Sequence, residues 1–173
     1  MILDMQSMFS WKQAITSTGY STDVTNAGCG FQGNGYMDLG PTDAFALSTM
    51  LTEKLGLGGG FSNDIYLVAL VTTQMNDHPT TPVATVVVTL ETADDASFTS
   101  NLPTLMTLGT FAAHSAAGSR LAGGLPPLAE FRRYLRVKYT VSGGPLSAGK
   151  FSAFFVNTLN ANKGGYPDRL SIA

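Results

Sequence analysis

Few residues in this chain have the types and spacing needed to hold a metal ion or to move protons. The two histidines are His78, which directly follows Asp77, and His114, which stands among small residues. Because loops from different strands of a sandwich can meet at one end, the Asp77-His78 pair could approach Asp94 and Asp95. Turn caps and solvated loop charges are much commoner roles, and the spacing lacks the pattern of a calcium loop. We therefore predict no catalytic residue and no metal site.

Two further motifs do not indicate a chemical site. Cys29, the single cysteine, has no basic neighbour in residues 27–30 that would lower the pKa of its thiol. Residues 28–35 are rich in glycine but lack the Gly-Lys-Ser/Thr ending of a phosphate-binding loop. No Gly-x-Ser-x-Gly motif occurs, and the serine, histidine and aspartate residues are too scattered to suggest a triad. The chain is thus predicted not to be an enzyme and to bind no cofactor.

Aromatic residues could instead line a sugar-binding surface. On strands, however, aromatic side chains more often belong to the core or to cross-strand pairs. A β-sandwich module that binds carbohydrate or adheres to a host surface is therefore kept as the alternative function, and it would need two or three coplanar exposed rings. The candidate rings are Tyr20, Phe31, Tyr36, Tyr66, Phe111, Tyr134 and Phe154.

The composition indicates one domain with a weakly polar surface. The chain has 173 residues, of which only 13% are charged, whereas a soluble domain usually has about 25%. Residues 1–119 carry ten acidic and two basic side chains, and residues 120–173 carry eight basic and two acidic ones. These charges either compensate each other within the fold or form a contact between subunits. The net charge of −2 does not favour nucleic-acid binding.

The first twelve residues are strongly apolar and are predicted to form an N-terminal arm. An apolar segment of this kind is expected to pack on its own domain or on a neighbouring molecule. It lacks the basic region and the long apolar run of a signal peptide, so we expect synthesis in the cytoplasm. The apolar residues of the arm are Ile2, Leu3, Met5, Met8, Phe9 and Trp11.

The clearest strand pattern lies near the end of the chain. In residues 132–141, apolar and polar side chains alternate strictly, which predicts a half-buried strand. Residues 142–150 contain Gly-Gly-Pro and predict a loop, and residues 151–156 predict a second strand. We interpret these segments as a long antiparallel hairpin in which Tyr134 and Phe154 are neighbours. Arg136 and Lys138 are expected to meet acidic residues of this chain such as Glu91, or alternatively an acidic surface of another protein.

The remaining patterns predict an all-β domain. Residues 65–73 predict a strand covered on both faces, residues 84–92 a half-buried strand, and residues 102–111 one or two strands. Residues 94–97 predict a turn that points Phe98 back toward the core, residues 112–127 a loop, and residues 42–55 the only helix. With six or seven strands at most, we predict an antiparallel β-sandwich or jelly roll with long loops, the N-terminal arm and at most one short helix. Residues 1–173 would form one domain, with 26–60 as a loop-rich insertion.

Short segments in the same order resemble the capsid cement, or decoration, proteins of tailed bacteriophages. The opening matches at residues 1–4, 9–10, 13–16 and 21–24, followed by Asp-Leu-Gly at 38–40. The middle matches at 90–98 (Leu-Glu-Thr-Ala-Asp-Asp-Ala-Ser-Phe). The end matches at 133–139 (Arg-Tyr-Leu-Arg-Val-Lys-Tyr), 144–150 and 166–167. Residues 26–36 and 50–60 appear as additional material, so no contacts are carried over to them.

This resemblance implies a jelly-roll protein on the outside of an icosahedral phage head, where it clamps neighbouring capsomers of the major capsid protein. The expected partners are the major capsid protein and further copies of this chain, with a dimer favoured over a trimer and with no nucleic acid or membrane. The expected location is the outer head surface, after synthesis in the bacterial host. Candidate contact residues are Met1, Ile2, Leu3, Met8, Phe9, Trp11, Tyr134, Arg136, Lys138 and Phe154.

Overall fold

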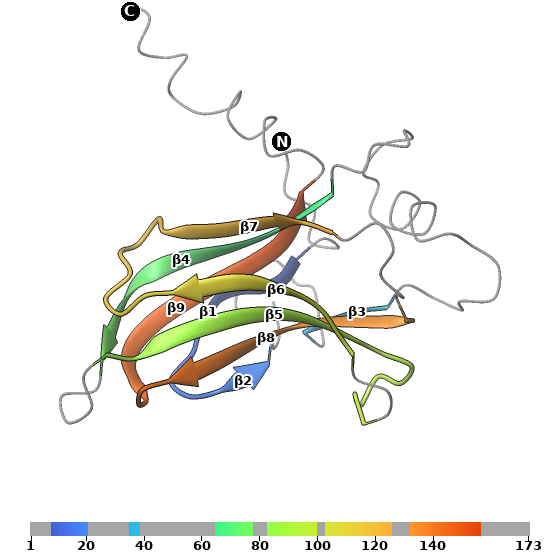
Figure 1. Cartoon of the computed structure of the whole chain (residues 1–173), viewed down its shortest axis with the longest axis horizontal. Coiled ribbons are helices and arrows are strands. Elements are labelled where there is room, and N and C mark those ends of the chain that lie inside the picture. Colours follow the sequence, from blue (N-terminus) through green and yellow to red (C-terminus); the bar gives the residue numbers. More distant parts are fainter. Residues whose placement is uncertain are drawn as a thin grey trace, which may run out of the picture.

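The computed structural model describes residues 8–20, 35–38, 65–77, 83–99, 103–125 and 132–156, and all regular structure in these ranges is β-strand. None of these residues forms a helix long and apolar enough to cross a membrane. The strands, shown in Figure 1, are β1 (Met8–Ala14), β2 (Gly19–Tyr20), β3 (Tyr36–Asp38), β4 (Tyr66–Asp77), β5 (Thr85–Ala93), β6 (Thr104–Phe111), β7 (Arg120–Gly124), β8 (Tyr134–Ser142) and β9 (Leu146–Val156).

The strands form two antiparallel sheets that pack face to face. Sheet A has the order β1-β9-β4-β7, and sheet B has the order β2-β8-β5-β6, with the short β3 paired to β8. In Figure 1, β5 and β6 of sheet B pass in front of β9 and β1 of sheet A. With β3 set aside, each sheet has four strands and the chain crosses repeatedly between the sheets. This is the strand order of a jelly roll, so the predicted fold class is confirmed.

The core lies between the two sheets and follows the predicted alternation. Leu135 and Val137 of β8 are fully buried, as are Val86 and Val88 of β5. From sheet A, the facing β9 contributes Phe155, whose ring meets that of Phe9 edge to face at a centroid distance of 5.0 Å. Burying a side chain of this size contributes about 1.5–3 kcal/mol relative to leaving it exposed. The apolar faces of the strands thus account for the sandwich.

The predicted hairpin is wrong, although both of its strands exist. β8 pairs with β2, β3 and β5 in sheet B, whereas β9 pairs with β1 and β4 in sheet A. Tyr134 therefore lies opposite Ala93, and Phe154 lies opposite Val68 in the other sheet. The connection through Gly143 and Gly144 carries the chain from one sheet to the other. A period of two identifies the buried face of a strand but not its hydrogen-bonding partner, which is why the pairing was mispredicted.

Several other boundaries differ from the prediction. Nine strands occur in the described residues, more than the six or seven expected, because β1 begins within the predicted arm 1–12, β3 forms within the predicted insertion 26–60 and β7 within the predicted loop 112–127. Residues 104–111 form a single strand, with a shift in register beside Gly109. Residues 8–12 belong to β1 and are not a separate arm. The predicted helix at 42–55 lies outside the described residues.

The predicted turn after β5 is confirmed. The carbonyl of Asp95 accepts a hydrogen bond from the backbone N–H of Phe98 at 3.1 Å. The Asp95 carboxylate accepts a second bond from the N–H of Thr99. Phe98 adopts a positive φ of 54° and is only 6% exposed, but its ring packs against Tyr36 and Arg136 on the outer side of sheet B and is not part of the core cluster between the sheets, where it was expected.

Candidate functional site

The aspartate and histidine residues considered as a possible metal or catalytic site lie at two separate ends of the sandwich. Asp77 ends β4, whereas Asp94 and Asp95 follow the far end of the nine-residue β5. A strand of that length spans roughly 30 Å, so the considered cluster of Asp77 with Asp94 and Asp95 does not form. His78 lies outside the described residues. No group of three or more metal-ligating side chains occurs in the part of the chain that the structure describes.

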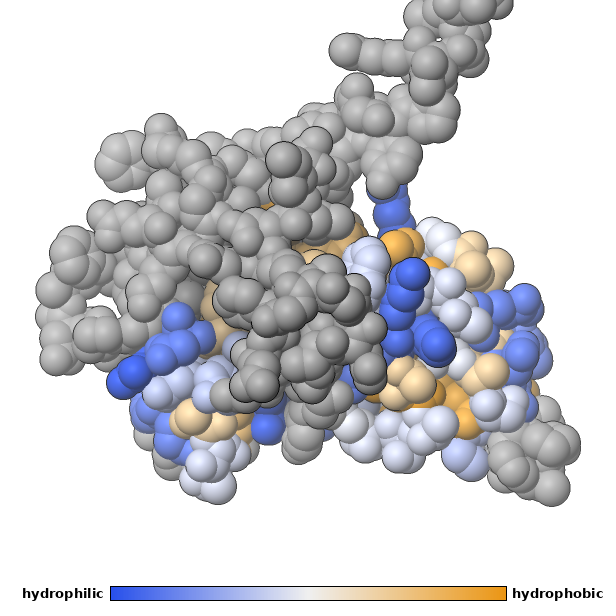
Figure 2. Space-filling model, turned by 180° about the vertical axis from the view of Figure 1, so that it is seen from behind, coloured by the Kyte–Doolittle hydropathy of each residue, from blue (hydrophilic) through white to orange (hydrophobic). Residues whose placement is uncertain are grey.

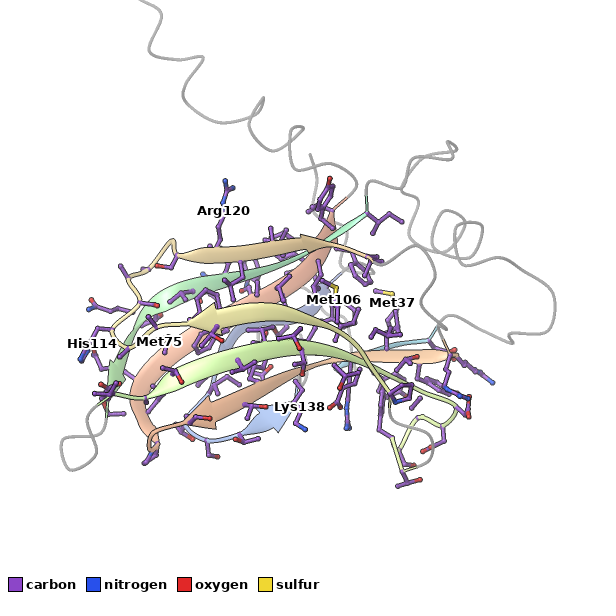
Figure 3. The ribbon with its side chains drawn as sticks, in the orientation of Figure 1. Met37, Met75, Met106, His114, Arg120 and Lys138 are labelled. Carbon is purple, nitrogen blue, oxygen red and sulfur yellow. The ribbon has the colours of Figure 1, made fainter. Side chains whose placement is uncertain are left out.

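Asp77 instead organises the start of β5. Its side chain is 5% exposed and accepts hydrogen bonds from the N–H groups of Val83 at 2.7 Å and Ala84 at 3.1 Å. The Nε2 atom of His114 lies 3.3 Å from Asp77 Oδ2, while the His114 side chain is 64% exposed. Figure 3 shows His114 at this end of the molecule. The carboxylate therefore satisfies backbone donors, and the imidazole lies beside it at the surface.

Glu91, Arg136 and Lys138 form an ion-pair cluster on the outer face of sheet B. Arg136 Nη2 lies 2.8 Å from Glu91 Oε2, and Lys138 Nζ lies 3.3 Å from Glu91 Oε1. The Glu91 side chain is 8% exposed and that of Arg136 is 12% exposed, so this pair is screened by solvent less than a surface pair. The prediction that both cations meet Glu91 is confirmed.

Two further arginines pair with carboxylates at the same end of sheet B. Arg132 Nη1 lies 2.6 Å from Asp94, and Arg133 donates two hydrogen bonds to Asp38. The hydrogen bonds to Asp38 raise the pKa of Arg133. Each of these pairs joins a basic residue from the C-terminal part of the chain to an acidic residue from the N-terminal part. Four of the eight basic residues of the C-terminal part, Arg132, Arg133, Arg136 and Lys138, are therefore compensated within the fold.

The aromatic rings beside these pairs are not coplanar. Tyr36 meets Tyr134 edge to face at 85° and Phe98 at 58°. The Arg136 guanidinium lies 4.2 Å from the Phe98 ring centroid, and that of Arg133 lies 5.0 Å from the Tyr134 centroid. A sugar platform needs parallel exposed rings, whereas these rings are tilted and in contact with arginines. This cluster does not favour the carbohydrate-binding alternative.

The outer face of sheet A carries a second apolar cluster, separate from the core. The register places Val156 opposite Tyr66 and Phe154 opposite both Val68 and Met8. Val68, Phe154 and Val156 are at most 8% exposed, and Met8 and Tyr66 pack against them. We call these five residues the outer apolar cluster. The solvent face of an antiparallel sheet is usually polar, so sheet A is a sheet with two apolar faces.

The same face of sheet A becomes cationic toward its other end. Leu70 of β4 lies between Arg120 of β7 and Ser152 of β9. Lys150 lies two residues before Ser152, on the same face of β9. The side chains of Arg120 and Lys150 are exposed, and Figure 3 shows Arg120 projecting away from β7. Lys12 of the neighbouring β1 is exposed as well, with its Nζ atom 5.4 Å from the Trp11 ring centroid.

A comparison with known protein families gives a match over most of the chain. Residues 9–155 match the model of a family described as Bbp16. The chain belongs to the Bbp16 family. The matched region begins in β1 and ends in β9, so it spans the whole sandwich. No curated protein matches the chain.

The predicted contact residues of this Bbp16-family chain are distributed over both sheets. Met1, Ile2 and Leu3 lie outside the described residues. Phe9 is 1% exposed in the core, so we no longer expect it to touch another protein. Met8 and Phe154 belong to the outer apolar cluster, and Trp11 is half-buried on β1. Tyr134, Arg136 and Lys138 lie on sheet B, where their contacts are within the chain.

Sequence reasoning missed the remaining residues of the outer face of sheet A. Val68 and Val156 were assigned only to strands, and Tyr66 only to a strand or a sugar-binding surface. Arg120 and Lys150 were not singled out. A signal for the apolar members was present, because residues 65–71 and 153–156 are almost continuously apolar. A strand with one solvent face would alternate instead. The register that brings Arg120 and Lys150 to one face could not be derived from the pattern.

Proposed function

We propose that this chain is a structural protein of a bacteriophage virion that binds the outside of the icosahedral head and clamps neighbouring capsomers of the major capsid protein. The observation that carries the proposal is the agreement between the resemblance and the fold. The resemblance to capsid cement proteins implies a jelly roll, and the strand order is that of a jelly roll. The family name, Bbp16, also hints at a phage protein.

The surface of the sandwich supports a role based on burial against partners. On the outer face of sheet A, Leu70 and Thr72 are half-buried and Ala122 and Gly124 are exposed, so weakly polar surface is accessible there. Figure 2 shows hydrophobic residues beside hydrophilic ones on the described part of the surface seen from behind. A cement protein stabilises a shell by burying area shared by several subunits, and simultaneous contacts raise its overall affinity well above that of one contact. A homo-oligomer, with a dimer favoured over a trimer, would add such contacts.

Binding to heads tests this function directly. Purified protein is mixed with expanded heads that lack it, assembled from the major capsid protein of the same phage, and bound protein is measured by sedimentation and gel analysis. We expect saturable binding and a higher thermal transition of the heads. Titration with soluble glycans, followed by Trp11 and tyrosine fluorescence, tests the alternative adhesion function. Absence of head binding would contradict the proposal, and a glycan response in its place would favour adhesion.

A further inference from the structure

The two outer faces of the sandwich differ in how their charges are compensated. On sheet B, each basic residue of the described strands has a carboxylate partner, as in the pairs of Glu91 with Arg136 and Lys138. On the outer face of sheet A, neither Arg120 nor Lys150 forms an ion pair with any described residue. The outward positions of β4, β7 and β9 contain no acidic side chain between residues 66–72, 120–124 and 150–156.

The cationic residues of sheet A are accompanied by accessible weakly polar surface. Leu70 and Thr72 of β4 are half-buried beside them, and Ala122 and Gly124 of the edge strand β7 are exposed. Small and apolar groups of this kind lose little hydration when they are covered, whereas the charges require a partner of opposite sign. The register of the sheet fixes these residues on one rigid surface.

We propose that the exposed end of this face, formed by Lys12, Leu70, Arg120 and Lys150, docks on an acidic protein surface of the shell. The partner chemistry follows from charge complementarity: carboxylates facing Arg120 and Lys150, with an apolar group between them facing Leu70. This inference rests on the proposed head binding and names the sheet that performs it. Sheet B then faces away from the docking surface, because its charges are already paired.

Paired charge variants of equal size test the docking face. Arg120→Gln with Lys150→Gln removes two positive charges from sheet A. Thr107→Glu with Thr110→Glu adds two negative charges to the outward side of β6 in sheet B, where both threonines are exposed. Both double variants lower the net charge by two. A difference in head binding between them therefore shows which sheet contacts the head and does not reflect the total charge. Binding to the stripped heads is measured for each protein at low and high salt, together with a thermal melt and a sedimentation coefficient of the free protein.

We expect the sheet A variant to bind the heads about tenfold more weakly at low salt and to show a smaller salt dependence, because surface charges are screened beyond about 10 Å at 0.1 M salt. The sheet B variant should bind like the unaltered protein. Equal binding by all three proteins would overturn the docking face and leave the proposed function standing. No binding by the unaltered protein would overturn both.

Different results are expected if the same chain or a second copy covers this face, or if the opposite sheet binds the head. If acidic segments of the same chain cover the cations, the sheet A variant lowers the melting temperature and leaves head binding unchanged. If a second copy covers them, the variant changes the sedimentation coefficient of the free protein and leaves head binding per oligomer unchanged. Weaker binding by the sheet B variant alone would place the docking surface on the opposite sheet. Each of these three results contradicts the inference.

Discussion

At the scale of single residues, one hydrogen bond joins the two sheets through the core. The hydroxyl of Tyr139 on β8 lies 2.7 Å from Oγ of Ser10 on β1, and both residues are fully buried. Burial raises the pKa of Tyr139, and the bond to Ser10 opposes that shift only in part. A buried hydroxyl without a partner costs about 1–3 kcal/mol, so each of these groups depends on the other.

The raised pKa of Tyr139 predicts a loss of stability at alkaline pH. Stability from this group is fully present below the unfolded-state pKa of about 10 and decreases as the pH rises toward the higher folded-state pKa, by about 1.4 kcal/mol per pH unit. Tyr139→Phe should lower the free energy of unfolding at pH 8 by about 1–3 kcal/mol and remove this alkaline loss. Urea unfolding at pH 8 and pH 11 measures both effects.

Ser10→Ala is the control for this prediction. It breaks the same hydrogen bond and should lower stability at pH 8, but it keeps the tyrosine and therefore keeps the alkaline loss. An alkaline loss of equal size in Tyr139→Phe and the unaltered protein would show that another group is responsible.

At the scale of elements, the sequence defined the strands better than their partners. The alternation in residues 132–141 and 84–92 identified β8 and β5 with their buried faces, and it placed Arg136 and Lys138 correctly beside Glu91. It could not show that β8 and β9 belong to different sheets, since a glycine-rich connection is compatible with both a sheet crossing and a hairpin. β7 was missed because Gly123 and Gly124 give it a weak strand pattern.

Gly123 lies where β7 packs closely against side chains of β6. A Cβ atom at this position would lie 2.9 Å from the Met106 side chain and 3.0 Å from that of Leu108. Both contacts are with the ends of flexible side chains, so a larger residue at this position would make Met106 and Leu108 of β6 shift slightly. The candidate site was likewise only partly predictable: the ion pairs on sheet B follow from local alternation, whereas the cationic face of sheet A depends on pairing between β4, β7 and β9.

The crossing between β8 and β9 is predicted to depend on Gly143. This residue has a φ of 87°, and a Cβ atom there would lie 2.3 Å from the carbonyl oxygen of Val83. Gly143→Ala should lower the free energy of unfolding by about 2–3 kcal/mol, since it combines backbone strain with a clash against main chain. Urea denaturation provides the measurement.

Gly118→Ala separates the cost of backbone strain from the cost of the clash with Val83. Gly118 has a similar φ of 92°, but no atom lies within 4 Å of a Cβ placed there. Its substitution should therefore show the backbone strain alone, about 1–2 kcal/mol. Equal losses at the two glycines would mean that the approach to Val83 contributes nothing.

At the scale of the whole molecule, sheet A combines the features expected of an attachment surface. Its outer face has accessible weakly polar groups and two exposed cations, Arg120 and Lys150, that form no ion pair with any described residue, whereas Arg136 and Lys138 of sheet B pair with Glu91. The described residues carry seven basic and five acidic side chains, whereas the rest of the chain carries three basic and seven acidic ones. The sandwich itself is thus slightly cationic in a chain whose net charge is −2.

The position of β1 in this sheet sharpens the predicted role of the N-terminal residues. Residues 1–7 join β1 at Met8, a member of the outer apolar cluster, and they include the apolar side chains Ile2, Leu3 and Met5. Removing residues 1–7 leaves Met8 as the first residue and keeps Phe9 in the core. We expect this shortened chain to fold and to occupy fewer sites on the head, because it loses apolar area that contributes to binding.

A longer deletion, of residues 1–9, shows whether head binding can be lost through unfolding of the domain as well as through loss of the N-terminal residues. It also removes Phe9, and the loss of a buried phenylalanine costs about 3–5 kcal/mol, so this chain should unfold at much lower urea concentration. Head occupancy is measured by sedimentation and folding by circular dichroism for both deletions. If the chain that lacks residues 1–7 occupies the heads as fully as the intact protein, the N-terminal residues do not contribute to attachment, and the exposed cationic end of sheet A would have to account for the binding.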